Sequence, residues 1–198
     1  MKLMTLIPKS EARKIAVQRR SELGDMEIRK KTDKLVERLI AADEYVYANT
    51  IHCYVSSRPS EVDTRKLIDI MEGSGKAIVV PKLNKAAKRF KRFHFMGWDS
   101  MIKNGDGYLE PKAGTDEDLS DIDLIIVPAL AVSIKGQRVG YGGRYYDKLL
   151  KDTHAPKIAL AFEYQVFDNI ETETHDVRID KIITERRTIN TRDGFSRS

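Results

Sequence analysis

Apolar side chains recur at helical spacing in two segments near the N-terminus. Over residues 9–23, alanine, isoleucine and leucine side chains fall on one face, basic side chains lie elsewhere, and Gly24 follows as a helix-ending residue. Residues 26–42 repeat the pattern with a longer apolar stripe that includes Leu35 and Leu39. These patterns predict two amphipathic helices that form a hairpin and pack on the rest of the protein.

Shorter apolar runs, separated by turn-rich segments, predict strands further along the chain. Residues 50–55 and 76–81 are rich in β-branched side chains, and residues 89–96 alternate phenylalanine with basic residues, as an exposed or edge strand does. Between the first two runs, a helix is expected to begin at Ser60, with Asp63 as part of its N-terminal cap, and to end at Gly73 to Gly75.

The second half of the chain continues this alternation. The apolar run 123–128 is typical of a parallel strand that is covered on both faces. A helix over residues 144–150 and strands over 157–162 and 181–184 follow. Together the segments predict one α/β domain over residues 1–198, with a central, mostly parallel sheet between two layers of helices. The polar residues 186–198 are expected to form a flexible tail.

Composition excludes several classes of protein. The 198 residues hold 35 Lys and Arg and 30 Asp and Glu, for a net charge of +5. The single cysteine, Cys53, cannot form an internal disulfide, which is typical of a reducing compartment. The longest uncharged apolar run, residues 124–134, is shorter than the roughly 18 residues of a membrane span, and the N-terminus has no signal-peptide pattern. We therefore expect a cytoplasmic protein without membrane segments.

The positive charge is concentrated in one place. Residues 82–92 hold six basic residues and no acidic one, whereas residues 116–123 hold five acidic residues and no basic one. A basic cluster of this kind suits a polyanion, such as nucleic acid, a phosphorylated cofactor or a polyglutamate tail. It equally suits a solvated hairpin, which is the more frequent role of such charge runs.

Residues 136–148 form a glycine-rich stretch after the apolar strand and at the start of the next helix. Ligands bind at this end of a strand in α/β sheets, and glycine-rich backbone followed by a helix N-terminus can bind phosphate. The stretch matches neither the P-loop nor the dinucleotide pattern, because Gly-Lys-Ser/Thr is absent and Tyr145 replaces the last glycine. The alternative is a tight structural connection, which is the more frequent role of a glycine-rich turn. The flanking Arg138, Arg144 and Lys148 favour phosphate binding enough to make the two interpretations about equal.

Three side chains at the start of this helix each fit two roles. Asp147 suits water-mediated binding of Mg²⁺ next to nucleotide phosphates, and it equally suits a favourable interaction with the helix dipole. Tyr145 and Tyr146 suit stacking on a flat heterocycle, or packing of the helix on the sheet. The residues alone leave both alternatives open.

The glycine-rich stretch nevertheless resembles a known signature. Residues 127–132, Gly136 and residues 138–148 are closely similar to the signature of the 5-formyltetrahydrofolate cyclo-ligase family, also called methenyltetrahydrofolate synthetases. Further segments match that family in chain order: residues 9–13 with Arg19 or Arg20, residues 61–64, residues 107–111, Gln165 and residues 175–185. Ordered matches from residue 9 to residue 185 are far more specific than a glycine-rich turn alone.

This resemblance implies a Rossmann-like fold and an enzyme that uses ATP and Mg²⁺. Members of the family convert 5-formyltetrahydrofolate and ATP into 5,10-methenyltetrahydrofolate, ADP and phosphate. Phosphorylation turns the formyl oxygen into a good leaving group, and the neighbouring folate nitrogen then closes the ring. The implied partner is a reduced folate, in some cases polyglutamylated, and neither nucleic acid nor a membrane. A monomer or weak homo-oligomer is expected.

The resemblance also implies site residues. The ATP-binding residues would be Lys9, Arg13, Arg138, Gly140, Tyr141, Gly142, Gly143, Arg144, Tyr145 and Tyr146. The folate would be bound by Ser56, Glu61, Tyr141, Gly142, Gly143, Arg144 and Tyr145, with Glu61 on the pterin. The catalytic residues would be Arg138, Tyr145 and Asp147, and the Mg²⁺ ligands Asp147 and Asp176.

The sequence departs from the family pattern at Arg144, where glycine is usual, and more mildly at Ala129. Either the backbone at residue 144 does not need a positive φ and the arginine adds a phosphate contact, or the loop is shifted and the activity altered.

Two other functions stay open at this stage. One is an ATP-dependent enzyme that acts on another N-formyl or carboxylate compound. The other is binding of single-stranded nucleic acid by residues 82–95, where phenylalanine and basic side chains alternate. Nucleic-acid binding is the weaker hypothesis, because a strand with one buried face shows the same alternation of phenylalanine and basic residues.

Overall fold

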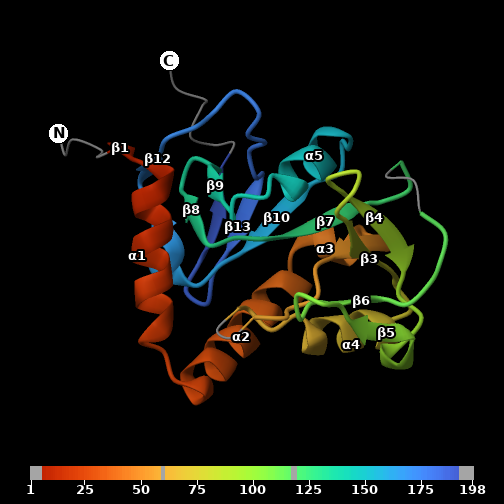
Figure 1. Ribbon diagram of the computed structural model, residues 1–198. Coiled ribbons are helices and arrows are strands. Elements are labelled where there is room, and N and C mark those ends of the chain that lie inside the picture. The colour runs from red at the N-terminus through yellow and green to blue at the C-terminus, as the bar shows by residue number, and fades with distance from the viewer. Residues whose placement is uncertain (1–5, 59–60, 117–119, 192–198) are drawn as a thin grey trace.

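A computed structural model describes residues 6–58, 61–116 and 120–191, and a mostly parallel sheet runs through its centre (Figure 1). The sheet has seven strands in these ranges, in the order β14-β13-β10-β7-β2-β3-β4. Their bounds are β14 Thr188–Asn190, β13 Lys181–Ile183, β10 Lys157–Leu160, β7 Leu124–Pro128, β2 Thr50–Cys53, β3 Ala77–Asn84 and β4 Arg89–His94. The two edge strands are antiparallel to their neighbours and the inner five are parallel. The predicted α/β class is confirmed.

The order of the inner strands fixes where a ligand crevice lies. Numbered along the chain, the five parallel strands stand in the order 2-1-3-4-5, with β2 and β7 as the first and third. This is the flavodoxin-like arrangement of a doubly wound sheet, so the Rossmann-like expectation holds for the layering and not for the strand order. Strand order reverses between β2 and β7, and the crevice is therefore expected at the carboxyl ends of these two strands.

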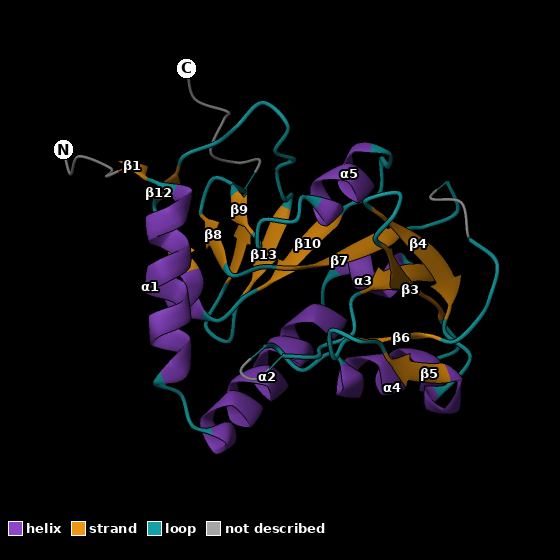
Figure 2. Ribbon diagram, in the orientation of Figure 1, coloured by secondary structure: helices purple, strands orange, loops and turns teal. Residues whose placement is uncertain are grey.

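Helices cover both faces of the sheet. The helices α2 (Asp25–Ile40) and α4 (Arg65–Gly73) lie on one side, and α5 (Tyr145–Lys151) lies on the other (Figure 1). The short helix α3 (Asp43–Tyr47) follows α2 and was not predicted. Figure 2 shows the resulting three layers of helix, sheet and helix. The central strands β2, β7 and β10 are buried on both faces, as their continuous apolar runs require.

The two N-terminal helices pack at separate places. The helix α1 (Lys9–Ser21) buries Ala12 and Ala16 against Ala131, Val139 and Ile170 in a small cluster of its own. By contrast, α2 buries its apolar stripe in the main core. Both helices are where the sequence predicts them, but they do not share the packing of a simple hairpin. As a result α1 stands beside the small strands next to the glycine-rich stretch (Figure 1).

Short strands that the sequence did not predict build the surroundings of α1 and the sheet edge. They are β1 (Leu6–Ile7) paired with β12 (Asn169–Ile170), β8 (Ala131–Ser133) between β9 (Arg138–Val139) and β11 (Val166–Phe167), and the hairpin of β5 (Met101–Lys103) and β6 (Leu109–Pro111). One-turn 3₁₀ helices span Trp98–Ser100 and Glu163–Gln165. Strands of two or three residues carry too little periodicity to be predicted.

The predicted start of α4 is wrong. The helix begins at Arg65, residues 61–64 are not helical, and Ser60 lies outside the described residues. Asp63 does not cap a longer helix, because its Oδ1 atom accepts hydrogen bonds from the Arg65 N–H, 3.0 Å away, and from the Ser56 hydroxyl, 3.0 Å away. This local turn competes with helix and delays the first helical residue.

The predicted flexible tail is wrong for its first part. Residues 188–190 form β14, which adds an antiparallel edge to the sheet next to β13. Thr191 follows it and is buried. Residues 192–198 lie outside the described part of the chain. The prediction of an edge strand at residues 89–96 is confirmed, since β4 forms the opposite edge.

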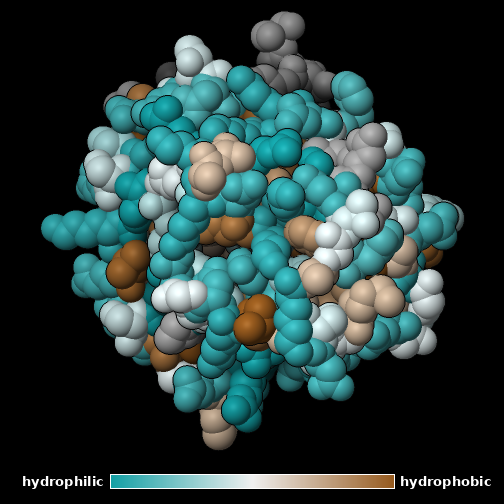
Figure 3. Space-filling model, turned by 45° about the vertical axis from the view of Figure 1, so that its right-hand side comes forward, coloured by the Kyte–Doolittle hydropathy of each residue, from teal (hydrophilic) through white to brown (hydrophobic). Residues whose placement is uncertain are grey.

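The face shown in Figure 3 is mainly hydrophilic, with smaller hydrophobic areas between the hydrophilic side chains. In the part of the chain that the structure describes, no helix combines the length and the apolar character that crossing a bilayer requires.

Candidate active site

A pocket of about 1220 Å³ opens at the point where the strand order reverses. The segments that follow β2 and β7 form its floor, through Tyr54, Val55 and residues 128–130. The helix α1 forms one wall and the glycine-rich stretch another. The crevice thus lies where the sheet topology places it.

Most of the predicted site residues line this one pocket. They are Lys9, Arg13, Glu61, Arg138, Gly140, Tyr141, Gly142, Gly143, Arg144, Tyr145, Tyr146, Asp147 and Asp176. Residues more than 160 positions apart in the chain, Lys9 and Asp176, are in direct contact there. Ser56 is the exception: it is buried below the pocket, and its hydroxyl donates to Asp63.

The glycine-rich stretch is not a single loop. Gly136, with φ +82, closes the tight turn between β8 and β9, and a Cβ atom there would lie 2.4 Å from the Ile179 carbonyl oxygen. Arg138 lies in β9, and only residues 140–144 form an irregular loop before α5. Gly142 has φ +98, which disfavours other residues. The stretch therefore provides a structural turn at one end and an irregular pocket wall at the other.

Arg138 and Asp147 form a buried ion pair in the pocket. The Arg138 Nη2 atom lies 2.9 Å from Asp147 Oδ1, and the two side chains are 5% and 15% exposed. Within the described residues, the Arg138 Nε atom and the Tyr146 hydroxyl are buried without a hydrogen-bond partner. Burial raises the pKa of Tyr146 well above its ordinary value, so the hydroxyl keeps its proton. Both groups are donors in the wall of the pocket, and buried donors of this kind suit anionic oxygens of a ligand.

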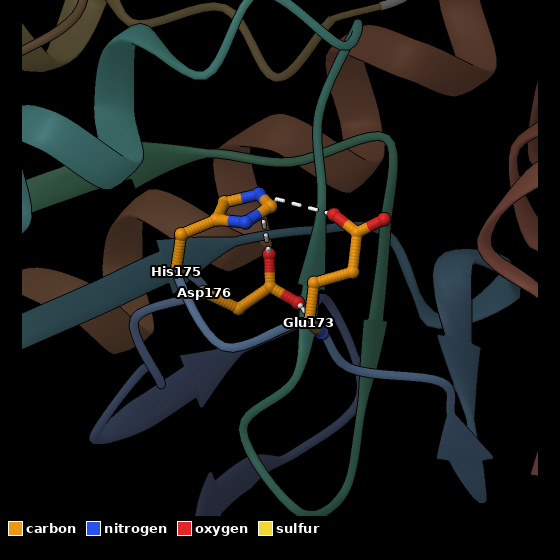
Figure 4. A group of neighbouring side chains, drawn as sticks. All are labelled: Glu173, His175 and Asp176. Carbon is orange, nitrogen blue, oxygen red and sulfur yellow. Dashed lines mark hydrogen bonds and ion pairs between the residues drawn. The ribbon is translucent and has the colours of Figure 1, made fainter.

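A second charged group lies around Asp176. The Lys9 ammonium is 2.5 Å from Asp176 Oδ2 and 3.3 Å from Glu173 Oε2. The His175 Nε2 atom lies 3.1 Å from the same Glu173 oxygen, and the three side chains from residues 173–176 face one another (Figure 4). Burial alone would raise the pKa of Asp176, but the Glu173 N–H and the Lys9 ammonium outweigh it and lower that pKa. Asp176 is therefore ionised at neutral pH.

These carboxylates are the groups that could hold a metal ion. Ligand atoms of Glu173, His175 and Asp176 all lie within 4.8 Å of one another. Carboxylate oxygens suit Mg²⁺, whereas imidazole does not. Of the two metal ligands implied by the resemblance, Asp176 belongs to this group, and Asp147 is the partner of Arg138.

Arg144 adopts a left-handed backbone, with φ 55 and ψ 15, directly before α5. The glycine of the family pattern is thus replaced without losing the positive φ, and the alternative in which residue 144 needs none is wrong. An arginine in this region is strained, because its Cβ approaches the backbone. Its side chain is 61% exposed, and its Nη2 atom lies 3.8 Å from Glu173.

Backbone N–H groups hold the Glu61 carboxylate in place. Its Oε2 atom accepts hydrogen bonds from the N–H groups of Ser57 and Arg58, each 3.1 Å away. The carboxylate is therefore fixed at the pocket wall by its own loop. A fixed carboxylate of this kind suits the paired N–H donors of a heterocycle such as a pterin.

Several contacts in the pocket were not predicted. Arg58, Tyr108 and Glu173 line it, and they come from three separate segments. Tyr108 lies in the matched segment 107–111 but was not assigned to the site, and no local pattern marks Arg58 or Glu173. His175 directly precedes Asp176 in the matched motif, and that adjacency was the signal available for it.

The basic cluster at residues 82–92 forms the β3–β4 hairpin at the sheet edge. Several of its charges are already paired: Lys85 with Asp106 at 2.7 Å, and Arg92 with Asp116 at 3.1 Å. Phe93 is buried, and Phe90 packs on the rings of the two tyrosines that begin α5. Aromatic rings that face the core cannot stack on exposed bases, which argues against single-strand binding.

Comparison with known proteins identifies the family. The model of the 5-formyltetrahydrofolate cyclo-ligase family matches residues 7–185. The chain belongs to this family. It is 26% identical over 181 residues to a 5-formyltetrahydrofolate cyclo-ligase of Haemophilus influenzae. The aligned residues cover 88% of this chain and 94% of the relative. It is 25% identical over 173 residues to the enzyme of that name from Escherichia coli K12, and this alignment covers 84% of this chain and 94% of the relative.

Solved structures agree. An NMR structure of Aquifex aeolicus 5,10-methenyltetrahydrofolate synthetase matches with a TM-score of 0.83 and 28% identity, over 96% of both chains. A Mycoplasma pneumoniae synthetase matches in fold, with a TM-score of 0.72 over 89% of this chain and 98% of that one. The protein is accordingly an ATP-dependent ligase that converts 5-formyltetrahydrofolate into 5,10-methenyltetrahydrofolate.

Proposed function

We propose that the pocket binds ATP, Mg²⁺ and the reduced folate side by side, and that the residues implied by the resemblance carry out the reaction. The main support is that charged side chains from separate segments line the same pocket. Cationic side chains from α1, β9 and the 140–144 loop meet three carboxylates in one pocket at the switch point of the sheet. Oxygen-rich phosphates and a hard cation are the ligands that this combination suits.

The nucleotide phosphates would be bound by Lys9, Arg13, Arg138 and Arg144. In support of this role, the Arg13 Nε atom donates to the Gly140 carbonyl at 3.1 Å, so its guanidinium lies beside the loop. Lys9 and Arg144 both lie next to Glu173, and phosphate oxygens would replace that carboxylate as their partner. Positioning and charge neutralisation are the main demands of phosphoryl transfer.

The metal would be held by Asp176, with Glu173 and Asp147 as the other candidate carboxylates. All three offer the hard oxygen donors that Mg²⁺ prefers. Bound there, Mg²⁺ would neutralise charge on the transferring phosphoryl group.

Arg138 would stabilise the charge that develops on the phosphoryl and formyl oxygens. Its buried guanidinium is oriented by Asp147, so little reorganisation is needed during the reaction. Glu61 would hold the pterin so that the formyl oxygen faces the nucleotide. The loop and Tyr145 would exclude water, which otherwise competes for the phosphoryl group.

The basic hairpin would guide a polyglutamate tail. A smaller pocket of about 470 Å³ adjoins the main one and is lined by Lys82, Lys85 and Lys91. Both pockets share Leu83 and Glu110 as lining residues. Affinity should rise with tail length and fall with salt if ammonium groups bind the added carboxylates.

The test is formation of the methenyl product, followed by its absorbance, with 5-formyltetrahydrofolate, ATP and Mg²⁺. We expect turnover that requires all three. ADP release without a folate, or with another N-formyl compound as the better substrate, would instead favour the second enzymatic interpretation. Absence of product from folded protein would contradict the proposed assignment.

Asp147→Asn should lower kcat by about 10- to 100-fold, because the neutral amide no longer orients the Arg138 guanidinium or holds the metal. Titration of Mg²⁺ separates the two roles: a metal ligand predicts a raised Mg²⁺ requirement, and an orienting role alone predicts an unchanged one. The control is Asp152→Asn, an exposed position just after α5, which should leave both kcat and the Mg²⁺ requirement unaltered.

A further inference from the structure

A cluster of two arginines and two tyrosines joins separate walls of the pocket. The Arg58 guanidinium lies between two rings, 4.1 Å from the centroid of Tyr141 and 5.0 Å from the centroid of Tyr108. It also donates to the Tyr108 hydroxyl. On the other side, Arg20 Nη1 donates to the Tyr141 hydroxyl at 2.7 Å. We name these four residues the Arg58 clasp.

Each member of the clasp comes from a different element. Arg20 lies in the last turn of α1, Arg58 in the loop after β2, Tyr108 just before β6, and Tyr141 in the loop before α5. All four line the main pocket. The clasp is therefore a contact between walls that are far apart in the chain, at the surface of the pocket itself.

The clasp links the two halves of the site. On one side, the Arg58 N–H donates to the Glu61 carboxylate, the proposed pterin contact, so the loop after β2 carries both groups. On the other side, Tyr141 is followed by Gly142 and Gly143 in the loop that faces the nucleotide. Because Gly142 has a positive φ and no side chain to pack, the Tyr141 contacts restrain this end of the loop.

We propose that Arg58 is a positioning residue that couples binding of the folate to binding of ATP, an inference that rests on the proposed function. A folate bound by Glu61 would hold that carboxylate, and the Arg58 N–H that donates to it, in the arrangement that the clasp requires. Arg58 then holds Tyr141, and the glycine loop is in place before ATP arrives. Binding of the second ligand then loses less conformational entropy than binding of the first. By linkage, each ligand raises the affinity for the other by the same factor.

The experiment measures both affinities with and without the other ligand. A non-hydrolysable ATP analogue and 5-formyltetrahydrofolate are titrated by calorimetry into the full chain. In the unsubstituted protein each ligand should tighten the other by about 5-fold or more, by the same factor in both directions. In Arg58→Gln that factor should fall to about one, while the affinity for each ligand alone changes by less than about 3-fold.

Two further variants refine the result. Arg58→Lys keeps the charge but loses the planar stacking, and it should retain only part of the coupling. Tyr108→Leu removes one of the two rings around the guanidinium and should also weaken the coupling without changing the affinity for the ATP analogue alone. The matched control is Arg65→Gln, an exposed arginine at the start of α4 that does not line the pocket; its coupling should equal that of the unsubstituted protein.

Three outcomes would overturn the inference. They are unchanged coupling in Arg58→Gln, loss of affinity for one ligand alone with the coupling intact, and absence of coupling in the unsubstituted protein. In the last case, product formation in the absorbance assay would still support the proposed function. Failure of the inference and failure of the proposed function are thus distinguished by turnover.

Discussion

At the scale of single residues, Arg144 shows strain retained in a functional loop. Its backbone is left-handed at φ 55, a region that a residue with a Cβ atom enters at a cost of about 1–2 kcal/mol. The sequence left open whether residue 144 needs a positive φ, and the structure shows that the arginine adopts one. Such strain concentrates where a ligand is bound. The charge of Arg144 at the mouth of the pocket is the benefit that we assign to it.

Arg144→Gly should therefore stabilise the folded protein by about 0.5–1 kcal/mol in urea unfolding, because glycine adopts the same backbone without strain. The KM for ATP should rise several-fold, because one phosphate contact is lost. Lys88→Gly is the control: Lys88 also has a positive φ, of 48, but does not line the main pocket. It should stabilise the protein and leave the KM unchanged. An unaltered KM in Arg144→Gly would remove the arginine from the phosphate site.

At the scale of elements, β14 shows how a polar segment becomes an edge strand of the sheet. Its sequence has no apolar run, yet it pairs with β13, and the residue that follows it, Thr191, is only 4% exposed. The Thr191 hydroxyl lies within hydrogen-bond distance of the carbonyl oxygens of Ile179 and Asp180. It also packs next to Gly136, so this edge supports the turn between β8 and β9.

Thr191→Val should destabilise the protein by about 1–3 kcal/mol, since the substitution keeps the shape but leaves a buried carbonyl without its donor. Urea unfolding at neutral pH measures this change. Thr188→Val, at an exposed position in β14, should stay within about 0.5 kcal/mol of the original protein. Equal effects of the two substitutions would mean that the hydroxyl contacts do not matter.

At the scale of the whole molecule, a buried histidine at the centre of the sheet makes the free energy of unfolding depend on pH. His52 lies in β2 and is fully buried. Burial, and then the nearby Arg92, lowers the pKa of His52 to about 3, so the imidazole is neutral in the folded protein. In the unfolded chain the same group titrates near its ordinary value of about 6.5. Protons therefore favour the unfolded state throughout this pH interval.

The sign of this effect follows from linkage. The contribution of His52 is fully present above pH of about 6.5 and is lost progressively as the pH falls toward 3, by about 2 kcal/mol between pH 7 and pH 5. In His52→Leu, the free energy of unfolding should fall less over the same range. His154→Gln, at an exposed position, should keep the original dependence. Unfolding measured in urea at pH 7, 6 and 5 tests this, and equal slopes in all three proteins would contradict it.

The location of the protein and its state of assembly stay predictions. The cytoplasmic location is not tested by the structure, and one relative, from Arabidopsis thaliana, is named as a mitochondrial 5-formyltetrahydrofolate cyclo-ligase. A monomer or weak homo-oligomer is likewise an expectation.

Sequence by itself determined the elements with strong periodicity and the identity of the family. The apolar runs of β7 and β10 and the stripe of α2 are local patterns, and motif residues such as Arg138 and Asp147 can be matched one by one. Tertiary structure alone decided the strand order, the placement of α1, the pairing of Lys9 with Asp176 and the Arg58 clasp. These depend on contacts between residues far apart in the chain, whose partners no local pattern specifies.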